Sequence, residues 1–182
     1  RAPLSALRMW QHRKGPRKDD DPIPDWVADA IQFFIQILPV LPGRKFFFGK
    51  KKIRRRPIVL YTDAMYDPNK TPAGMVGIVI YDPEDPTSKW RYASAAVPQE
   101  LIDKFRTRKQ YVGQLEVLAA VAAFTSRPEQ LRDRDVIHFI DNMGALIGMA
   151  KGYSADVDSA RLVSVFHTMN AALRANVWFE YV

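Results

Sequence analysis

Short apolar segments alternate with turn-forming residues over the last two thirds of this chain. Segments that combine β-branched or aromatic residues with flanking Asp, Asn and Pro are typical of strands. Five segments fit this description, which are residues 58–63, 74–81, 89–97, 135–140 and 176–182. Short turns join the first three, so we expect these strands to pair as an antiparallel meander.

Four other segments repeat their apolar residues at helical spacing, which are residues 25–38, 109–126, 142–151 and 155–175. Asp25 is the expected N-cap of the first, and residues 98–108 are expected to form a loop. A helical crossover from the first to the fourth strand makes these strands parallel neighbours. The pattern therefore predicts an α/β fold, in which helices flank a five-stranded mixed sheet of three antiparallel strands followed by two parallel ones.

Three acidic residues interrupt these apolar elements. Asp63 and Asp141 stand at the ends of the first and fourth predicted strands, and Glu116 lies in an otherwise apolar helix. Carboxylates are costly to bury without a charge partner, and the carboxyl ends of neighbouring parallel strands open one crevice. Small residues beside Glu116, such as Gly113 and Ala120, would let its helix lie close to the sheet. We therefore expect the three carboxylates to converge on a bound cation.

Each of these acids also has a simpler interpretation. Asp63 and Asp141 could be turn or cap residues, and Glu116 could lie at an exposed helix edge. Six other acids fit turns or helix starts better, which are Asp67, Asp82, Glu84, Asp85, Asp156 and Asp158. The chain has no cysteine, and we expect His138 and His167 to be structural, so nothing indicates a zinc site.

The net charge of +7 is unevenly distributed, because residues 1–56 carry +9 and residues 57–182 carry −2. We predict a basic connecting segment with one helix over residues 1–56, and a separate domain over residues 57–182. A basic arm beside a neutral body suits nucleic-acid binding, although a solvated linker has the same composition. The candidate nucleic-acid contacts are Lys104, Arg106, Arg108, Lys109, Arg54, Arg55 and Arg56. Phe46 to Phe48 could stack on bases or dock on a neighbouring surface.

No apolar run is long enough to span a bilayer, and no secretory signal opens the chain. Together with the absence of cysteine, this pattern fits an intracellular protein of the cytoplasm or nucleus that has no membrane contact.

The motifs around the three acids are Tyr61-Thr62-Asp63-Ala64, Gln114-Leu115-Glu116-Val117 and Ile140-Asp141-Asn142, and Lys151-Gly152-Tyr153-Ser154 follows them. In order and spacing this set resembles the ribonuclease H domain that follows reverse transcriptase in retroelement polyproteins. The resemblance covers the chain from about residue 57 to its end. It implies a ribonuclease H-like fold that hydrolyses the RNA strand of an RNA–DNA hybrid.

By the same resemblance, Asp63, Glu116 and Asp141 are catalytic residues that bind two Mg²⁺ ions, for which Mn²⁺ could substitute. The implied partners are the hybrid and a reverse transcriptase domain, N-terminal to this one in the same polyprotein. The family also carries a fourth acidic ligand after the fifth strand, and the sequence stops at Val182 before that position. We expect such a C-terminally incomplete chain to bind one metal ion well and the second poorly.

Other functions fit the same residues. A catalytically inactive ribonuclease H-like module could bind nucleic acid or tether a polymerase, and a simple nucleic-acid-binding protein could work through the basic arm alone. Other nucleases and strand transferases of this fold fit less well. A proofreading exonuclease would carry a second acid where Met65 stands, and an integrase would place its glutamate last in the chain, whereas Glu116 is second.

Overall fold

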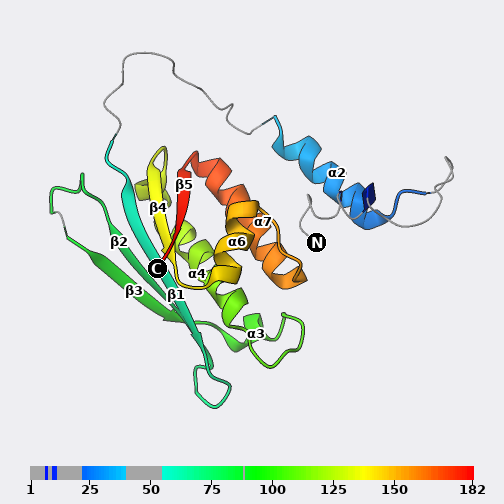
Figure 1. Cartoon of the computed structure of the whole chain (residues 1–182), viewed down its shortest axis with the longest axis horizontal. Coiled ribbons are helices and arrows are strands. Elements are labelled where there is room, and N and C mark those ends of the chain that lie inside the picture. Colours follow the sequence, from blue (N-terminus) through cyan, green and yellow to red (C-terminus); the bar gives the residue numbers. More distant parts are fainter. Residues whose placement is uncertain (1–6, 8–9, 12–21, 40–54, 88) are drawn as a thin grey trace.

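The computed structural model describes residues 7, 10, 11, 22–39, 55–87 and 89–182. Its elements, in chain order, are α2 (Asp25–Ile37), β1 (Ile58–Tyr66), β2 (Gly74–Tyr81), β3 (Arg91–Ala96), α3 (Gln99–Ile102), α4 (Val112–Ser126), α5 (Pro128–Leu131), β4 (Asp135–Ile140), α6 (Met143–Lys151), α7 (Val157–Leu173) and β5 (Asn176–Tyr181). The five predicted strands and four predicted helices are all present (Figure 1).

The strands form one sheet in the order β3-β2-β1-β4-β5. β1 is antiparallel to β2, and β2 is antiparallel to β3. β4 is parallel to both β1 and β5. The predicted mixed sheet, with three antiparallel strands followed by two parallel ones, is therefore confirmed.

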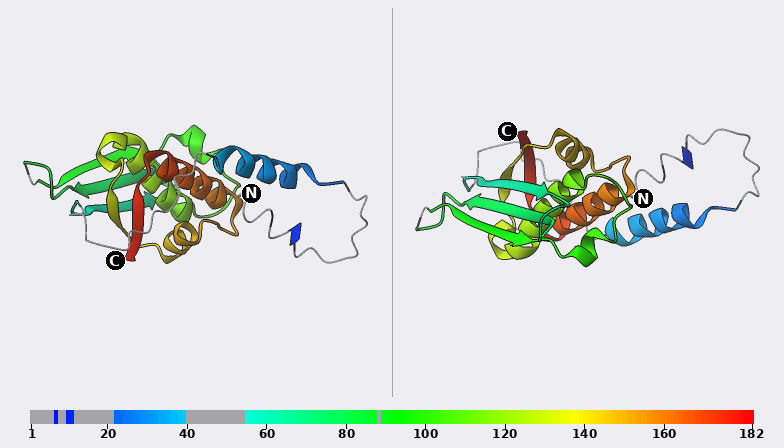
Figure 2. Two further views of the ribbon diagram at one scale, coloured as in Figure 1. Left: turned by 90° about the horizontal axis from the view of Figure 1, so that it is seen from above. Right: turned by 90° about the horizontal axis from the view of Figure 1, so that it is seen from below.

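Helices α4, α6 and α7 cover one face of this sheet, and α2 lies on their far side (Figures 1 and 2). α4 is the central helix, because it contacts β1 and β2 on one side and α6 and α7 on the other. That position explains why α4 is apolar nearly all round. The opposite face of the sheet carries exposed aromatic side chains, including Tyr92 and Trp178, which are 87% and 67% exposed.

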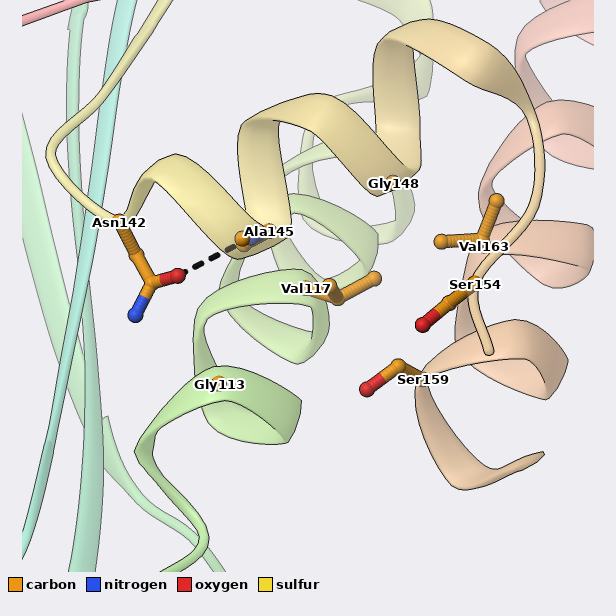
Figure 3. Close-up of a pocket in the computed structure, with 9 residues that line it drawn as sticks. Gly113, Val117, Asn142, Ala145, Gly148, Ser154, Ser159 and Val163 are labelled. Carbon is orange, nitrogen blue, oxygen red and sulfur yellow. Dashed lines mark hydrogen bonds between the residues drawn. The ribbon is translucent and has the colours of Figure 1, made fainter. Parts of the chain in front are cut away.

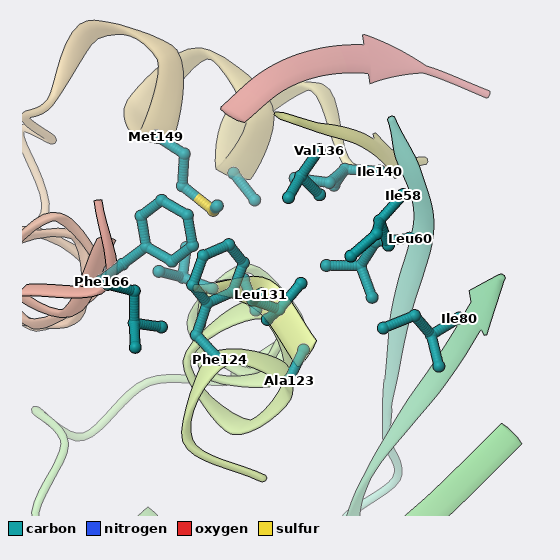
Figure 4. Packing of buried hydrophobic residues seen from close by; sticks show 14 of the residues in the cluster. Ile58, Leu60, Ile80, Ala123, Phe124, Leu131, Val136, Ile140, Met149 and Phe166 are labelled. Carbon is teal, nitrogen blue, oxygen red and sulfur yellow. The ribbon is translucent and has the colours of Figure 1, made fainter. Parts of the chain in front are cut away.

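The main core lies between the sheet and the helices (Figure 4). Leu60 of β1 and Ile140 of β4 are fully buried there. The rings of Phe124 from α4 and Phe166 from α7 meet edge to face, with centroids 4.8 Å apart. Complete burial of such a side chain contributes about 1.5–3 kcal/mol relative to exposure. The core therefore fixes α4 against β1 and β4, the elements that carry the three acids.

The structure corrects several predicted boundaries. Asp25 is the first helical residue of α2, and the N-cap is Pro24. β1 continues past Asp63 to Tyr66, because the added residues pair with β2. The short helix α3 occupies part of the segment that was predicted to be a loop, and α5 is a further short helix that the sequence pattern did not predict.

None of the described helices is both long and apolar enough to cross a membrane. The division of the chain between residues 1–56 and residues 57–182 stays a prediction. Arg54 and the three consecutive phenylalanines from Phe46 to Phe48 lie outside the described residues.

Candidate metal centre

Asp63 of β1 and Asp141, which directly follows β4, occupy matching positions relative to the pairing of these two parallel strands. The pairing of β1 with β4 ends at Tyr61 and Phe139, and each acid lies two residues beyond this pair. Side chains alternate along a strand, so Asp63 shares a sheet face with Tyr61, whose ring stacks on that of Phe139 with the centroids 4.6 Å apart. The sequence prediction that Asp63 ends its strand is wrong, because Asp63 also pairs with Gly77 of β2. Asp141 does follow the last residue of β4, as predicted.

The residue after Asp141 fixes the start of the next helix. Asn142 is the N-cap of α6, and its Oδ1 accepts a hydrogen bond from the backbone N–H of Ala145 at 3.0 Å. This cap satisfies one of the free N–H groups of the first helical turn. Asp141 is therefore held between the end of β4 and a capped helix start, whose positive dipole end favours a nearby carboxylate.

Glu116 reaches the same place from α4. Its side chain is only 2% exposed, and its Oε2 has no hydrogen-bond partner among the described residues. Ala119 and Ala120 are fully buried on the same helix, and α4 contacts β1 and β2. The predicted close approach of the helix to the sheet is therefore confirmed. A buried carboxylate oxygen without a partner is costly, so this atom is placed to receive a ligand.

The three acids converge as predicted. Asp63, Glu116 and Asp141 each offer an oxygen, and these three atoms lie within 4.8 Å of one another. Burial is the largest cause that raises the pKa of Glu116 to about 8, and the charges of Asp141 and then Asp63 add to it. The backbone N–H of Ala64 partly opposes this shift of the pKa. An all-carboxylate set suits hard divalent cations, and a cation would both pair Glu116 and relieve the repulsion. The cluster can therefore hold a metal ion.

A search of solved structures identifies the fold. RNase H1 from the halophilic archaeon Halobacterium salinarum matches with a TM-score of 0.52 at 15% identity, over 70% of this chain and 86% of that protein. The chain has a ribonuclease H-like fold. At this identity the similarity establishes the fold and not the activity.

Two further solved structures match with lower TM-scores. An RNase H1 isolated from compost by a metagenomic approach gives a TM-score of 0.49 at 16% identity, over 69% of this chain and 84% of that one. The foamy viral protease-reverse transcriptase in complex with an RNA/DNA hybrid gives 0.49 at 9% identity, over 96% of this chain and 25% of that one. No family model matches the chain, and no curated protein sequence matches it.

A cavity of about 180 Å³ lies between α4, α6 and α7 of this ribonuclease H-like fold (Figure 3). Its lining consists mostly of small residues, which are Gly113, Val117, Asn142, Gly144, Ala145, Gly148, Ser154, Ser159 and Val163. Gly113 lies three residues before Glu116, and Asn142 directly follows Asp141. The lining therefore includes near neighbours of two of the acids along the chain, but none of the three acids themselves.

The predicted basic cluster lies in the segment before α4. Lys104, Arg106 and Lys109 are exposed and form no ion pair with the rest of the described chain. Arg108 differs, because its guanidinium binds Asp158 and also Asp156, with 2.7 Å between Nη1 and Oδ1 of Asp156. Arg108 therefore anchors the segment to the start of α7, whereas the other three side chains face solvent.

Asp156 and Asp158, which the sequence analysis assigned only to a helix start, are the partners that hold Arg108 in place. Asp156 is the N-cap of α7, and its Oδ2 accepts hydrogen bonds from Ser159 and Gln114. Asp158 is 2% exposed and accepts the backbone N–H of Arg106 at 2.8 Å. No local sequence signal could reveal these contacts, because the partners lie about fifty residues apart, as in the Arg108 to Asp158 pair.

The basic residues before β1 are partly engaged. Arg55 pairs with Glu84, with 2.6 Å between Nε and Oε2. The exposed Arg56 donates its backbone N–H to the same carboxylate at 3.0 Å. Both residues lie beside the β2–β3 turn that contains Glu84. The structure therefore does not place them next to the segment of Lys104 to Lys109.

His138 and His167 take up structural positions. His138 is fully buried, which lowers its pKa to about 3, and its Nε2 lies 2.8 Å from the hydroxyl of Thr62. His167 lies against α6, with its Nε2 2.8 Å from the carbonyl oxygen of Met149. Neither belongs to the group of acids that could hold a metal ion, in agreement with the sequence analysis.

Proposed function

We propose that this chain is a metal-dependent ribonuclease H, an endonuclease that cleaves the RNA strand of an RNA–DNA hybrid. The proposal also places it beside a reverse transcriptase domain in one polyprotein, for which the sequence resemblance is the support. The observation that carries the enzymatic proposal is the convergence of Asp63, Glu116 and Asp141 within 4.8 Å. The ribonuclease H-like fold around this cluster supports it.

The donor set fits the proposed cofactor. Asp63, Glu116 and Asp141 would hold one Mg²⁺ ion well and a second one poorly, or Mn²⁺ in their place, because these cations prefer oxygen ligands. When bound, such a pair activates a water and stabilises the leaving 3′-oxygen of the RNA strand. The unpartnered Oε2 of Glu116 is the clearest sign that this chain is built to receive a cation.

The chain's own residues supply position and charge for this reaction. Asp63 and Asp141 are exposed and reach outward from the strands, where a phosphate can approach. Glu116 stands behind them and must lose its proton before it can act as a ligand, since burial and its neighbours raise its pKa to about 8. The exposed Lys104, Arg106 and Lys109 would contact phosphates without regard to sequence.

The test combines metal binding with cleavage. We expect calorimetry to detect Mg²⁺ or Mn²⁺ binding to the unaltered chain, and a labelled hybrid to be cut only in its RNA strand. Asp63→Asn, Glu116→Gln and Asp141→Asn should each weaken metal binding and reduce cleavage by about 10²-fold or more, because each removes one ligand charge. The matched control is Glu100→Gln, which changes an exposed acid on α3 and should alter neither readout.

Two results would contradict the proposal. Retention of full cleavage by the variants at Asp63 and Asp141 would exclude the carboxylate cluster as the active centre. Hybrid binding without cleavage, at any Mg²⁺ or Mn²⁺ concentration, would instead support a non-catalytic module that holds nucleic acid.

A further inference from the structure

Two glycines flank the three acids at positions where the fold would accept a side chain. Gly77 lies inside β2 and pairs directly with Asp63. Gly113 lies in the first turn of α4, three residues before Glu116. Glycine destabilises strands and helices relative to alanine, because its backbone loses more conformational freedom on folding. Both positions therefore use a residue that local stability disfavours.

Packing within the chain does not explain either glycine. A methyl group added at Gly113 would meet no described atom within 4 Å, and one added at Gly77 would meet only the carbonyl oxygen of Asp63, at 3.9 Å. Gly74 is different, because a methyl group there would lie 2.9 Å from the side chain of Leu115. Gly74 is thus required by the core, whereas Gly77 and Gly113 leave open space around them.

Gly113 shares α4 with Glu116, whose buried carboxylate lacks a partner in the described part of the chain for one of its oxygens. Glu116 is 2% exposed, and its Oε2 has no partner among the described residues. Gly113 lines the cavity between α4, α6 and α7 (Figure 3) and lies about one helical turn before Glu116 along α4. On the other side of the cluster, any side chain at Gly77 would stand beside that of Asp63, since residues paired across strands share a face.

We propose that Gly77 and Gly113 are positioning residues. Because they have no side chains, they leave a path free beside the carboxylates, here called the lane, along which the nucleic-acid strand to be cut can bind. Glycine in a strand often marks a place where a ligand approaches the backbone closely. Here the sugar–phosphate chain of the substrate passes over Gly113 and Gly77, and its scissile phosphate comes within reach of Asp63 and Asp141. This inference rests on the proposed function, because it takes the substrate to be a nucleic-acid strand.

The test adds bulk to the lane in steps, with Gly113→Ala, Gly113→Leu and Gly77→Ala in the full chain. The control is Ala172→Leu, which adds the same bulk at an exposed position of α7. Five quantities are measured, which are the melting temperature, the Mn²⁺ affinity, the Kd for a labelled hybrid in EDTA, and the KM and kcat with Mg²⁺.

We expect Gly113→Ala to melt at or above the temperature of the unaltered chain and to keep its Mn²⁺ affinity. Its Kd and KM for the hybrid should rise severalfold, and those of Gly113→Leu by about 10-fold or more, because a small displacement of the strand spoils its alignment. Gly77→Ala should show the same rise in KM. Ala172→Leu should leave both constants unchanged.

Unchanged hybrid binding by Gly113→Ala and Gly77→Ala, in a chain that itself binds the hybrid, would overturn this inference and leave the proposed function standing. An equal loss of binding in Ala172→Leu would also overturn it, because added bulk would then act nonspecifically. If the unaltered chain binds no hybrid at all, the proposed function fails together with the inference.

Discussion

Arg134 and Asp82 form a buried, two-pronged ion pair across 52 residues of sequence. The two guanidinium nitrogens donate to the two carboxylate oxygens at 2.9 and 2.8 Å. The residues are only 4% and 9% exposed. Arg134 also donates to the backbone carbonyl of Arg56 at 3.0 Å. One guanidinium thus joins the β2–β3 turn, the start of β4 and the residues before β1.

The first prediction concerns this ion pair. Asp82→Ala should lower the free energy of unfolding by about 3–5 kcal/mol, because it leaves the buried Arg134 charge unpaired. The hydrogen bonds from Arg134 are the main cause that lowers the pKa of Asp82 in the folded chain. The ion pair therefore stabilises the fold fully when the pH is above the pKa of Asp82 in the unfolded chain. This stabilisation is lost as the pH falls through the lower pKa of Asp82 in the folded chain. Urea unfolding at neutral and acidic pH measures both effects.

Arg174 supplies the control for this prediction. It pairs with Asp133 at 2.6 Å on the surface, where both side chains are more than half exposed. Arg174→Ala should cost less than about 1 kcal/mol. A loss for Asp82→Ala no larger than that for Arg174→Ala would show that the buried pair contributes little to stability.

The second prediction separates the two kinds of cation before α4. Arg106→Ala and Lys109→Ala should weaken hybrid binding and reduce the slope of log Kd against log salt by about 1 each, because each removes one phosphate contact. Arg108→Ala should mainly destabilise the fold, since it leaves the buried Asp158 without its guanidinium partner. Hybrid titrations at several salt concentrations, together with thermal melts, distinguish these outcomes. If Arg108→Ala instead reduced the slope of log Kd against log salt by about 1 and left the stability unchanged, Arg108 would be a phosphate contact and not an anchor of the fold.

The third prediction concerns the hydrogen bond behind the acids. Thr62 and His138 are buried partners on β1 and β4, and Thr62→Val preserves the side-chain shape while it removes the hydroxyl. We expect a loss of about 1–3 kcal/mol, because the buried Nε2 of His138 is left unsatisfied. Thr125→Val is the control, since the exposed hydroxyl of Thr125 only bonds carbonyls of its own helix. Equal unfolding midpoints for the two variants would contradict the prediction.

The register of the sheet explains why the site could be predicted from sequence. Ile58 to Tyr61 pair in register with Val136 to Phe139 on the two parallel strands, and each acid lies two residues beyond this paired stretch, so the two acids come to the same level. Glu116 was recognisable because a charge inside an apolar helix needs a partner. These signals are local or periodic, and a single sequence carries both kinds.

Contacts between polar residues far apart in sequence were not predictable in this way. Asp82 lies in a turn rich in proline and acids, and nothing beside it points to Arg134 as its partner. The sequence does not distinguish Arg108 from the exposed basic residues around it, because its partners Asp156 and Asp158 lie at the start of α7 and meet it only in the folded chain. The extension of β1 beyond Asp63 likewise depends on pairing with β2, because Asp63 and Ala64 themselves show no strand preference.

The last prediction follows from the raised pKa of Glu116. Its pKa is about 8 in the folded chain against an ordinary value of 4.5, so the folded state binds the proton more tightly than the unfolded state. Without metal, stability should therefore fall as the pH rises from about 4.5 to 8 and should level off above that, with a total change on the order of a few kcal/mol. Glu116→Gln should remove this decline, whereas Glu100→Gln should keep it. Urea unfolding in EDTA from pH 5 to 9 measures the slope, and saturating Mg²⁺ at pH 8 should restore stability only where Glu116 is present. Identical slopes in the two variants would mean that Glu116 does not titrate in this range, and that the carboxylates do not repel one another as their spacing implies.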